Sequence, residues 1–359
     1  MSSQTLQNLG YDDFFESNRK KMGLDGFLMA RVISEQKGTY KVKDQDGEYT
    51  GRITGKQMFE ASLREDYPAV GDWVAIIKLD EERAVIKKIL PRKTIIKRKC
   101  NSKNEAQVVG ANIDVAFVVE SVDRDYNLNR FERYFAIAKD GGVTPAIILN
   151  KTDLLTADEL NVLSSQLKER FPDTDIIFTS VTKNDGVDEL KRYIKKWKTH
   201  CFLGSSGVGK SSLINRLLGK DVIKTEDISS YSERGKHVTT VRQMYFLENG
   251  GIVIDNPGMR EVGMTDVNAG IDDLFDAIVA LAKKCKYADC THTHEPGCEV
   301  LAAVKAGKIN KDHYANYLNL KKEAEYYEMN ALEKKEKDRQ FGKFIKQAKK
   351  ELKDFRHKD

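Results

Sequence analysis

The sequence predicts a multidomain protein with a small β-barrel at the amino end, an α/β domain in the centre and a helical domain at the carboxyl end. Three observations lead to this prediction. Short β-rich segments separated by turn residues occupy residues 26–90, strands and helices alternate over residues 112–219, and from about Thr265 the pattern becomes helical and charged. A chain of 359 residues is too long for one ordinary core, which agrees with two or three domains.

The composition indicates a reduced, soluble protein. Charged residues make up 32% of the chain, but the net charge is only +5, so the chain as a whole does not indicate a nucleic-acid partner. The amino terminus lacks the basic-then-apolar order of a signal peptide and no apolar run of about 18 residues occurs, so we expect a cytoplasmic protein. The cysteines, five in all with three inside fourteen residues, favour reduced thiols and a metal over disulfides.

The barrel is expected within residues 1–95, after an extension of 25 residues to which we assign no role. Its strands are the β-rich segments 27–34, 38–44, 47–54, 72–79 and 83–90, which are separated by Gly, Asp and charged turns. Basic residues occur along them, and they favour a solvated outer face and an RNA-binding face about equally. These residues are Arg31, Lys41, Lys43, Arg52, Lys78, Lys87 and Lys88.

A basic linker, residues 96–108, leads into the central domain, residues 109–264. The apolar run "NIDVAFVVES" predicts a buried parallel strand. The following β-α alternation predicts a doubly wound sheet with helices on both faces. In order, we expect a helix at 128–142, a strand at 144–154, a helix at 157–171, a strand at 175–180, a helix at 186–197, a strand and helix at 201–219, and a hairpin at 241–258.

The stretch "GSSGVGKS" matches the phosphate-binding pattern G-x-x-x-x-G-K-[ST], with an apolar strand before it and a helix after it. Backbone N–H groups of such a loop turn inward around phosphates, the start of the helix adds a partial positive charge, and Lys210 reaches the outer phosphates. We expect Ser211 to hold Mg²⁺. The residues expected around the phosphates are Gly204, Ser205, Ser206, Gly207, Val208, Gly209, Lys210, Ser211 and Ser212.

The stretch "NKTD", Asn150 to Asp153, predicts guanine recognition. One carboxylate can accept from both the N1–H and the N2 amino group of guanine, whereas adenine has an acceptor at N1 and no N2 amino group. Asp153 is therefore expected to select GTP over ATP. Lys151 is expected to lie along the base, Asn150 to fix the loop, and Ser180 in "TSVTKNDG" to supply a backbone contact to the guanine oxygen.

The stretch "DNPG" follows the strand "GIVI". This order places Asp255 to bind Mg²⁺ through water and the N–H of Gly258 near a γ-phosphate. Between the P-loop and this strand lies "YSERGKHVTTVRQ", a segment expected to be mobile, in which Thr239 or Thr240 closes onto the Mg²⁺. The guanine motifs precede the P-loop instead of following it, which is the order of a circularly permuted GTPase domain.

The stretch "CKYADCTHTHEPGC" predicts a structural metal site. Three thiolates and one imidazole fill a tetrahedron, which suits Zn²⁺ and leaves no open position for catalysis. His294 is a competing ligand, and Cys201, on the strand before the P-loop, is expected to be a small core residue. The expected zinc ligands are Cys285, Cys290, His292 and Cys298.

The permuted order, the preceding barrel and the cysteine cluster resemble the ribosome small subunit-dependent GTPase A (RsgA) family. The resemblance runs from "YPAVGDWV" through "ESVDRDYNLNRFERYFAIA" and "EPGC" to the basic tail. It implies an OB-fold barrel, a permuted GTPase, a zinc-binding helical domain over residues 265–359, and a role in late maturation of the small (30S) ribosomal subunit. Where the family usually reads His-Thr-Thr-Thr, this chain has Val238, which leaves open whether Thr239 or Thr240 binds Mg²⁺.

Hydrolysis is expected to be slow without a partner. Many GTPases orient the attacking water with a glutamine just after D-x-x-G, and this chain has Met259 there, whose thioether can neither orient nor deprotonate water. The family resemblance points to His237 as the residue that positions the water, with a solvent-exposed loop histidine as the alternative. Other candidates for stabilising the developing charge are Arg234, Lys236 and Arg260.

The leading hypothesis is a monomeric GTP hydrolase that binds the small ribosomal subunit and its rRNA through the barrel and the basic tail. That tail, residues 334–358, holds eleven Lys or Arg against four Asp or Glu, and a solvated helix is its alternative interpretation. A second hypothesis is a module whose nucleotide switches RNA affinity, with hydrolysis incidental. A P-loop kinase of a small metabolite is disfavoured, because "NKTD" and "DNPG" would be unexplained.

Overall fold

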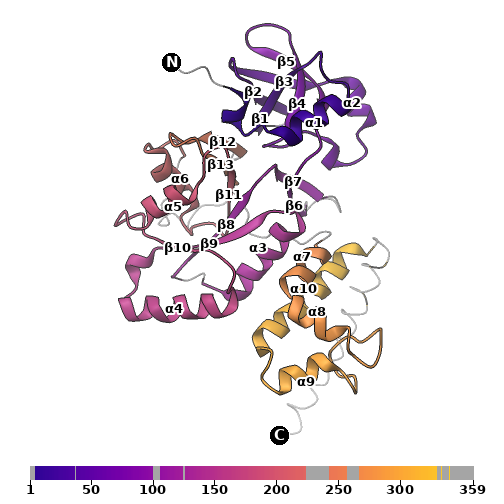
Figure 1. The fold of residues 1–359 in the computed structure, drawn as a ribbon, viewed down its shortest axis with the longest axis vertical. Coiled ribbons are helices and arrows are strands. Elements are labelled where there is room, and N and C mark those ends of the chain that lie inside the picture. Colours follow the sequence, from indigo (N-terminus) through magenta and orange to yellow (C-terminus); the bar gives the residue numbers. More distant parts are fainter. Residues whose placement is uncertain are drawn as a thin grey trace, which may run out of the picture. The chain divides into compact units, whose positions relative to one another are not determined.

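The computed structural model describes residues 5–36, 38–99, 106–123, 126–223, 242–256 and 267–329, together with residues 333 and 339. These residues form two compact units (Figure 1). The first is built from residues within 1–263 and 269–276, and the second from residues within 264–268 and 277–359. Among the described residues, no helix combines the length and apolarity needed to span a membrane.

The amino-terminal part of the first unit contains a closed five-stranded barrel, as the sequence predicts. Its strands pair in the order β1-β2-β3-β5-β4, and β4 also pairs with β1. Alternate residues point inward and form an apolar core that includes Val32, Val42 and Ile86. The strands are β1 Leu28–Gln36, β2 Thr39–Lys43, β3 Glu48–Ile53, β4 Trp73–Lys78 and β5 Arg83–Ile89, with a short helix α2 Gly55–Glu60 and a 3₁₀ turn η2 Arg64–Asp66 between β3 and β4.

The first 25 residues, to which the sequence assigned no role, contain a packed part of this barrel. A 3₁₀ turn η1 (Leu6–Leu9) leads to helix α1 (Asp13–Lys21), whose first turn is capped by the Asp12 carboxylate, which accepts from the N–H of Phe14. Leu9 and Phe15 are buried against Trp73 and its neighbours on the outer side of β1 and β4. The extension thus supplies a second apolar layer outside the barrel core.

Arg31 corrects the prediction that the barrel's basic residues lie on a solvated or RNA-binding face. Its side chain is buried, with 1% of the residue exposed. The guanidinium donates to the carbonyl oxygens of Leu9, Gly71 and Asn112 and, at 2.8 Å, to Oγ1 of Thr199. Burial lowers its pKa to about 10, so the group stays charged at neutral pH. The other six basic residues are half-buried or exposed; Lys43 and Lys78 form ion pairs, whereas Lys41, Arg52, Lys87 and Lys88 are exposed.

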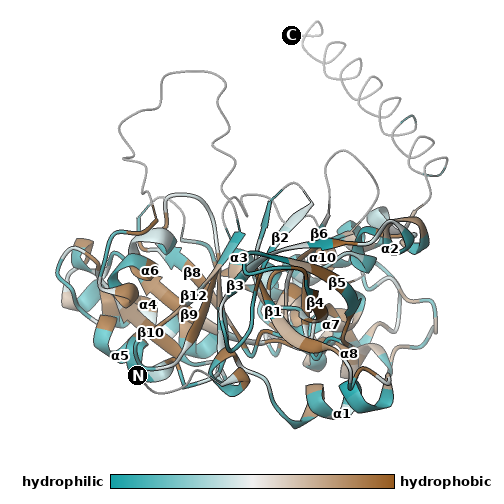
Figure 2. Ribbon diagram, turned by 90° about the horizontal axis from the view of Figure 1, so that it is seen from above, coloured by the Kyte–Doolittle hydropathy of each residue, from teal (hydrophilic) through white to brown (hydrophobic). Residues whose placement is uncertain are grey.

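The central part of the first unit is the doubly wound sheet that the β-α alternation predicts. Its strands lie in the order β10-β9-β8-β11-β13-β12, all parallel except β12, which pairs antiparallel with β13 as the predicted hairpin. The strands are apolar, and Figure 2 shows β8 and β9 among the most hydrophobic elements. They are β8 Val115–Ser121, β9 Thr144–Asn150, β10 Ile176–Thr179, β11 Thr199–Leu203, β12 Arg242–Phe246 and β13 Ile252–Asp255.

Helices cover the sheet on both faces. Helices α5 (Val187–Tyr193) and α6 (Lys210–Leu218) pack on one face, where Leu190 and Leu213 join the apolar side chains of the strands. Helix α3 (Leu128–Asp140) contacts β8 and β9, and its buried Glu132 forms an ion pair with Arg170 of α4 (Ala157–Arg170). Helix α5 ends at Tyr193, before the predicted end at residue 197, because the backbone becomes extended at Ile194.

The region predicted as a basic linker contains a two-stranded hairpin. Strand β6 (Ile95–Lys99) pairs antiparallel with β7 (Ala106–Ala111), and a bulge interrupts the register between Ile96 and Lys97. Ile96 and Val108 are buried, whereas the basic residues that suggested a linker, Lys97 to Lys99, follow one another at the end of β6. The domain boundaries around this hairpin stay a prediction.

The carboxyl-terminal part is helical, as the sequence predicts. Helix α7 (Asn268–Leu274) contributes to the first unit, where the backbone N–H of Gly270 donates to Asp140 and Lys139 pairs with Asp273. The second unit contains α8 (Asp276–Ala282), α9 (Glu299–Lys305) and α10 (Lys311–Glu328). Apart from residue 339, the basic tail at 334–358 lies outside the described residues.

Candidate nucleotide site and metal centre

The loop between β11 and α6 has the backbone conformation that the "GSSGVGKS" pattern predicts. Gly204, Gly207 and Gly209 have φ values of 144°, 87° and 98°, a region that favours glycine. A Cβ on Gly204 would lie 2.2 Å from the carbonyl oxygen of Val119, and one on Gly209 would lie 2.3 Å from Nδ2 of Asn150. The neighbouring strands therefore approach this loop so closely that both positions require glycine.

Lys210 and Asp255 place opposite charges at the base of this loop. Lys210 is 8% exposed, and its Nζ donates to the carbonyl oxygens of Gly204 and Ser205 at 2.7 and 2.5 Å. Burial lowers the pKa of Lys210 to about 8 and raises the pKa of Asp255 to about 6, and the attraction between the two charges opposes the shift at each residue. Such a buried ammonium is suited to receive a phosphate oxygen.

The residues at this loop also fit a bound Mg²⁺. Oδ1 of Asp255 is buried and has no hydrogen-bond partner among the described residues. Ser211 lies in the first turn of α6, and Asp255 ends the neighbouring strand β13. A carboxylate and a hydroxyl are oxygen ligands of the type that Mg²⁺ prefers, together with nucleotide phosphates and water.

The "NKTD" segment follows β9 and is bonded to the P-loop. Nδ2 of Asn150, which is 1% exposed, donates to the carbonyl oxygen of Val208 at 2.8 Å, and its Oδ1 accepts from Oγ1 of Thr179 at 2.9 Å. The side chain of Val208 itself is buried in the core of the sheet. The asparagine thus joins three loops that are far apart in sequence.

Lys151 and Asp153 are each oriented by one partner. Lys151 has φ of 63°, and its Nζ pairs with Oδ2 of Asp123 at 2.8 Å. Oδ1 of the half-buried Asp153, in the short 3₁₀ turn η3 (Thr152–Leu154), accepts from Oγ of Ser180 at 2.6 Å. The remaining carboxylate oxygen has no side-chain partner in the described chain, so it is available for a base. Ser180 therefore orients Asp153 through its hydroxyl, and the backbone contact from Ser180 to the guanine oxygen stays a prediction.

These segments meet because β9, β10, β11 and β13 are parallel and their carboxyl ends share one edge of the sheet. The structure thereby brings together Asn150 to Asp153, Ser180, the loop Gly204–Ser212 and Asp255. Other predicted site residues lie outside the described residues, namely His237, Thr239, Thr240 and Gly258, as does Met259. Sequence reasoning did not single out Asp123 and Thr179, whose only signal was their place just after or at the end of a predicted strand.

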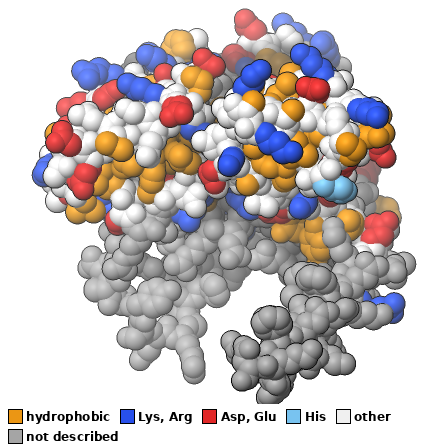
Figure 3. Space-filling model, turned by 90° about the horizontal axis from the view of Figure 1, so that it is seen from below, with side chains coloured by type: hydrophobic (Ala, Val, Ile, Leu, Met, Phe, Trp, Pro, Cys, Tyr) orange, Lys and Arg blue, Asp and Glu red, His pale blue; other side chains and the backbone are white. Residues whose placement is uncertain are grey.

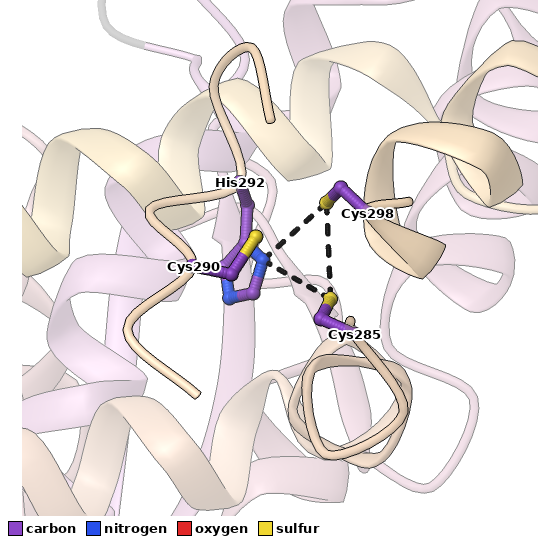
Figure 4. A group of neighbouring side chains, drawn as sticks. All are labelled: Cys285, Cys290, His292 and Cys298. Carbon is purple, nitrogen blue, oxygen red and sulfur yellow. Dashed lines mark hydrogen bonds between the residues drawn. The ribbon is translucent and has the colours of Figure 1, made fainter. Parts of the chain in front are cut away.

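The predicted cysteine cluster is assembled in the second unit (Figure 4). The ligand atoms of Cys285, Cys290, His292 and Cys298 all lie within 4.8 Å of one another. Sγ of Cys285 is 3.6 Å from Nδ1 of His292 and 3.8 Å from Sγ of Cys298, and Sγ of Cys298 is 3.5 Å from the same Nδ1. Ligands about 2.0–2.3 Å from a tetrahedral Zn²⁺ lie roughly 3.4–3.8 Å apart, so the cluster can hold such an ion.

The loop that carries the cluster is ordered by two residues that sequence reasoning missed. The Glu295 carboxylate accepts from the backbone N–H groups of Thr291, Thr293 and His294, and the Tyr314 hydroxyl donates to the carbonyl of His292 at 2.6 Å. His294, the competing ligand, is exposed and lies against the Thr293 hydroxyl instead of joining the group of four.

Two cysteines, Cys100 and Cys201, lie outside the cluster. Cys201 is fully buried, as predicted for a core residue. Cys100 lies outside the described residues.

Asp153→Asn is expected to weaken GTP binding about a hundredfold. An amide must present a donor to one of the guanine N–H groups, and a mispaired buried polar group costs a few kcal/mol. Xanthine has a C2 carbonyl where guanine has the amino group, so the same variant is expected to gain affinity for xanthosine triphosphate. Calorimetry with both nucleotides checks this, with the exposed Asp173→Asn as a matched control. Unchanged GTP affinity would remove Asp153 from the site.

Comparison with known proteins agrees with this arrangement. A model of the family described as RsgA GTPase matches residues 89–265. A relative from Lactiplantibacillus plantarum, named small ribosomal subunit biogenesis GTPase RsgA 2, is 39% identical over 339 residues, which cover 93% of this chain and 94% of the relative. The crystal structure of YjeQ from Thermotoga maritima superposes with a TM-score of 0.60 and 26% identity, over 81% of this chain and 96% of that one. The crystal structure of YloQ, described as a circularly permuted GTPase, has the same TM-score at 20% identity. That match covers 85% of this chain and 97% of YloQ.

Proposed function

Since the chain belongs to the RsgA GTPase family and is a GTP-hydrolysing enzyme, we propose that it acts in biogenesis of the small ribosomal subunit, docking on that subunit through rRNA and being stimulated by it. The observation that carries this proposal is that the Asn150–Val208 hydrogen bond and the Lys210–Asp255 pair lie at the same edge of the sheet. The chain also has a relative named small ribosomal subunit biogenesis GTPase RsgA 2.

The geometry around the P-loop supports the following nucleotide roles. Backbone N–H groups of Gly204–Ser212 and the ammonium of Lys210 hold the phosphates, Asp153 reads the base, Lys151 lies along it, and Ser180 orients Asp153. When bound, Mg²⁺ neutralises charge on the β- and γ-phosphates. Ser211 and either Thr239 or Thr240 would hold the ion, with Asp255 acting through water, and the N–H of Gly258 would lie near the γ-phosphate.

The zinc role is structural. Three thiolates and an imidazole leave no position for a substrate, so the cluster of Cys285, Cys290, His292 and Cys298 stabilises the fold of the helical unit. Cys298 also caps α9, because its Sγ accepts from the N–H of Leu301 at 3.4 Å.

The rRNA role is assigned to one side of the barrel and to the tail. Lys41 on β2, Arg52 on β3 and Lys87 on β5 are exposed on the outer faces of adjacent strands, whereas the outer side of β1 and β4 packs against the amino-terminal extension. On the face of the molecule that Figure 3 draws, seen from below Figure 1, basic side chains are interspersed with acidic and apolar ones. A local cluster, not the net charge of +5, therefore supplies the phosphate contacts.

Reversing the charge of the barrel face is expected to weaken docking. The triple variant Lys41→Glu, Arg52→Glu, Lys87→Glu should lower co-sedimentation with purified small subunits at least tenfold at moderate salt, and the remaining affinity should depend less steeply on salt because fewer phosphate contacts are made. A matched triple variant at the exposed Lys168, Lys195 and Lys220 of the central domain should bind like the wild type. Equal binding by the two triple variants would assign rRNA contact elsewhere.

A further inference from the structure

Helix α2, on the outside of the barrel, buries none of its six residues (Figure 1). Short helices are marginal in water, and most of them depend on packing of an apolar face. Here a capping box defines the helix instead: the Thr54 hydroxyl accepts from the N–H of Gln57, and the Gln57 side chain accepts from the N–H of Thr54. The helix is therefore held by local hydrogen bonds, and its apolar side chains are left for another role.

Three apolar side chains on α2 and the turn after it face solvent. Phe59 is 91% exposed, and Met58 and Leu63 are each 57% exposed. Single exposed apolar residues are common on protein surfaces. Three of them within residues 58–63, one an aromatic ring that is almost fully solvated, indicate a surface that another molecule covers.

The barrel edge from which α2 starts is basic. The helix follows β3, the strand that carries the exposed Arg52. Strands β3 and β5 are parallel, and Ile53, the last residue of β3, lies opposite Ile86. The exposed Lys87 therefore lies at the level where the chain leaves β3 for α2, and Lys56 adds a side chain that is 82% exposed on the helix itself. The cations assigned to rRNA thus continue into α2.

The acidic side chains near α2 already have partners. Glu60 pairs with Lys56 at 3.7 Å, Glu65 pairs with Lys97 at 2.8 Å, and the Asp66 carboxylate accepts from two backbone N–H groups of its own turn. The pair between Glu60 and Lys56 is exposed, so it contributes little and Lys56 can exchange it for a phosphate. These acids therefore do not prevent an anionic partner from reaching the edge.

We propose that Phe59 stacks on an unpaired base of RNA, beside the phosphate contacts of Arg52 and Lys87. This inference rests on the proposed docking of the barrel on rRNA, and it adds a base contact to a face that otherwise supplies charge. Every base has a π-face, so an aromatic ring binds single strands with little sequence preference. The basic side chains around the ring favour RNA over a protein, which would need acidic groups to pair with them.

Stacking and charge can be separated by their dependence on salt. Each phosphate contact to a single strand releases counterions and adds about 0.7 to the slope of log affinity against log salt concentration. An uncharged ring releases none. Removal of the Phe59 ring should therefore weaken binding at every salt concentration and leave the slope unchanged, whereas the charge variants of the barrel face lower the slope.

The test measures binding to a labelled single-stranded RNA of about 12 nucleotides, within the roughly 4–16 that one OB fold occupies. A duplex of the same sequence, whose bases are stacked on one another, and purified small subunits are measured in parallel. Phe59→Ala is expected to weaken binding to the single strand and to the subunits about tenfold, a typical loss for one stacked base, with unchanged duplex binding.

Two further variants serve as controls. Phe59→Trp keeps an aromatic ring and should bind the single strand like the wild type. Phe14→Ala removes a ring on α1 that is 37% exposed and should also bind like the wild type. Because the Phe59 side chain is exposed, its truncation should leave Tm unchanged.

The outcomes separate the inference from the proposed function. Wild-type affinity of Phe59→Ala for the single strand would overturn the inference, and the proposed function would stand if the triple charge variant still loses small subunits. A loss with small subunits alone would overturn it by assigning the ring to a ribosomal protein. Equal losses for single strand and duplex, or a lowered salt slope, would overturn it by indicating an indirect effect on the cations. If neither Phe59→Ala nor the triple variant weakened binding to small subunits, the proposed rRNA face would fall together with the inference.

Discussion

Small ribosomal subunits are expected to raise the rate of GTP hydrolysis by about a thousandfold, as ordering of the catalytic groups does in other GTPases. In the free protein, the loop Gly204–Ser212 and the buried Lys210 and Asp255 already have the arrangement expected around a nucleotide phosphate. The position that carries a water-orienting glutamine in many GTPases is Met259, so the free protein has no amide there. Docking should instead hold the segment around His237 over the γ-phosphate.

The variant His237→Ala is expected to lose most of this stimulation while its GTP affinity stays nearly the same. An imidazole that positions water acts on the transition state, so its removal lowers kcat without weakening ground-state binding. The measurement is steady-state hydrolysis against small-subunit concentration, with His313→Ala on α10 as the matched control. A wild type that is not stimulated, or a His237 variant that keeps full stimulation, would refute this mechanism, and the first result would favour the GTP-switched binding module.

Loss of the metal is expected to unfold the region around α9 while nucleotide binding persists. Structural zinc sites contribute on the order of 10 kcal/mol in small domains, which exceeds the stability of most small folds. Cys298→Ser is the sharpest variant, because a serine hydroxyl can still accept from the N–H of Leu301 and keep the cap of α9. Any loss of structure then reflects the missing thiolate.

Elemental analysis, far-UV circular dichroism and GTP binding test this together. Wild type should carry one Zn²⁺ per chain, and Cys298→Ser and His292→Ala should carry little and lose helical signal. His294→Ala should match the wild type, because that ring lies against the Thr293 hydroxyl and does not join the group of four. Zinc-free wild-type protein purified without chelators would contradict the site. Loss of the metal in His294→Ala, with the metal kept in His292→Ala, would show that His294 is the ligand in place of His292.

The barrel, the doubly wound sheet and the Cys/His cluster could be predicted because each depends on local spacing. Alternating apolar residues define the strands, glycines at Gly204 and Gly209 satisfy close approaches that any such loop makes, and Cys285 to Cys298 are near one another in sequence. These local patterns can be recognised in the sequence without knowledge of tertiary contacts. The same holds for the hairpin β12–β13, which its turn residues indicate.

The features that sequence reasoning missed all depend on distant partners. Arg31 resembles the other barrel cations in sequence, and only its four acceptors from separate segments make its burial possible. Strand β6 carries Lys97, Arg98 and Lys99, which suggested a linker, and only its pairing with β7 shows that the segment is a hairpin. Asp123 and Tyr314 likewise gain their roles from residues far along the chain.

The burial of Arg31 has a consequence for the order in which the chain folds during synthesis. Its acceptors lie 22, 40, 81 and 168 positions away, and the farthest, Thr199, is made long after the barrel strands have emerged. At about 5–20 residues per second, the guanidinium waits on the order of ten seconds for that hydroxyl. A nascent barrel therefore keeps an incompletely bonded cation in its wall until β11 arrives, and the amino-terminal half of this protein matures only when the P-loop strand has left the ribosome.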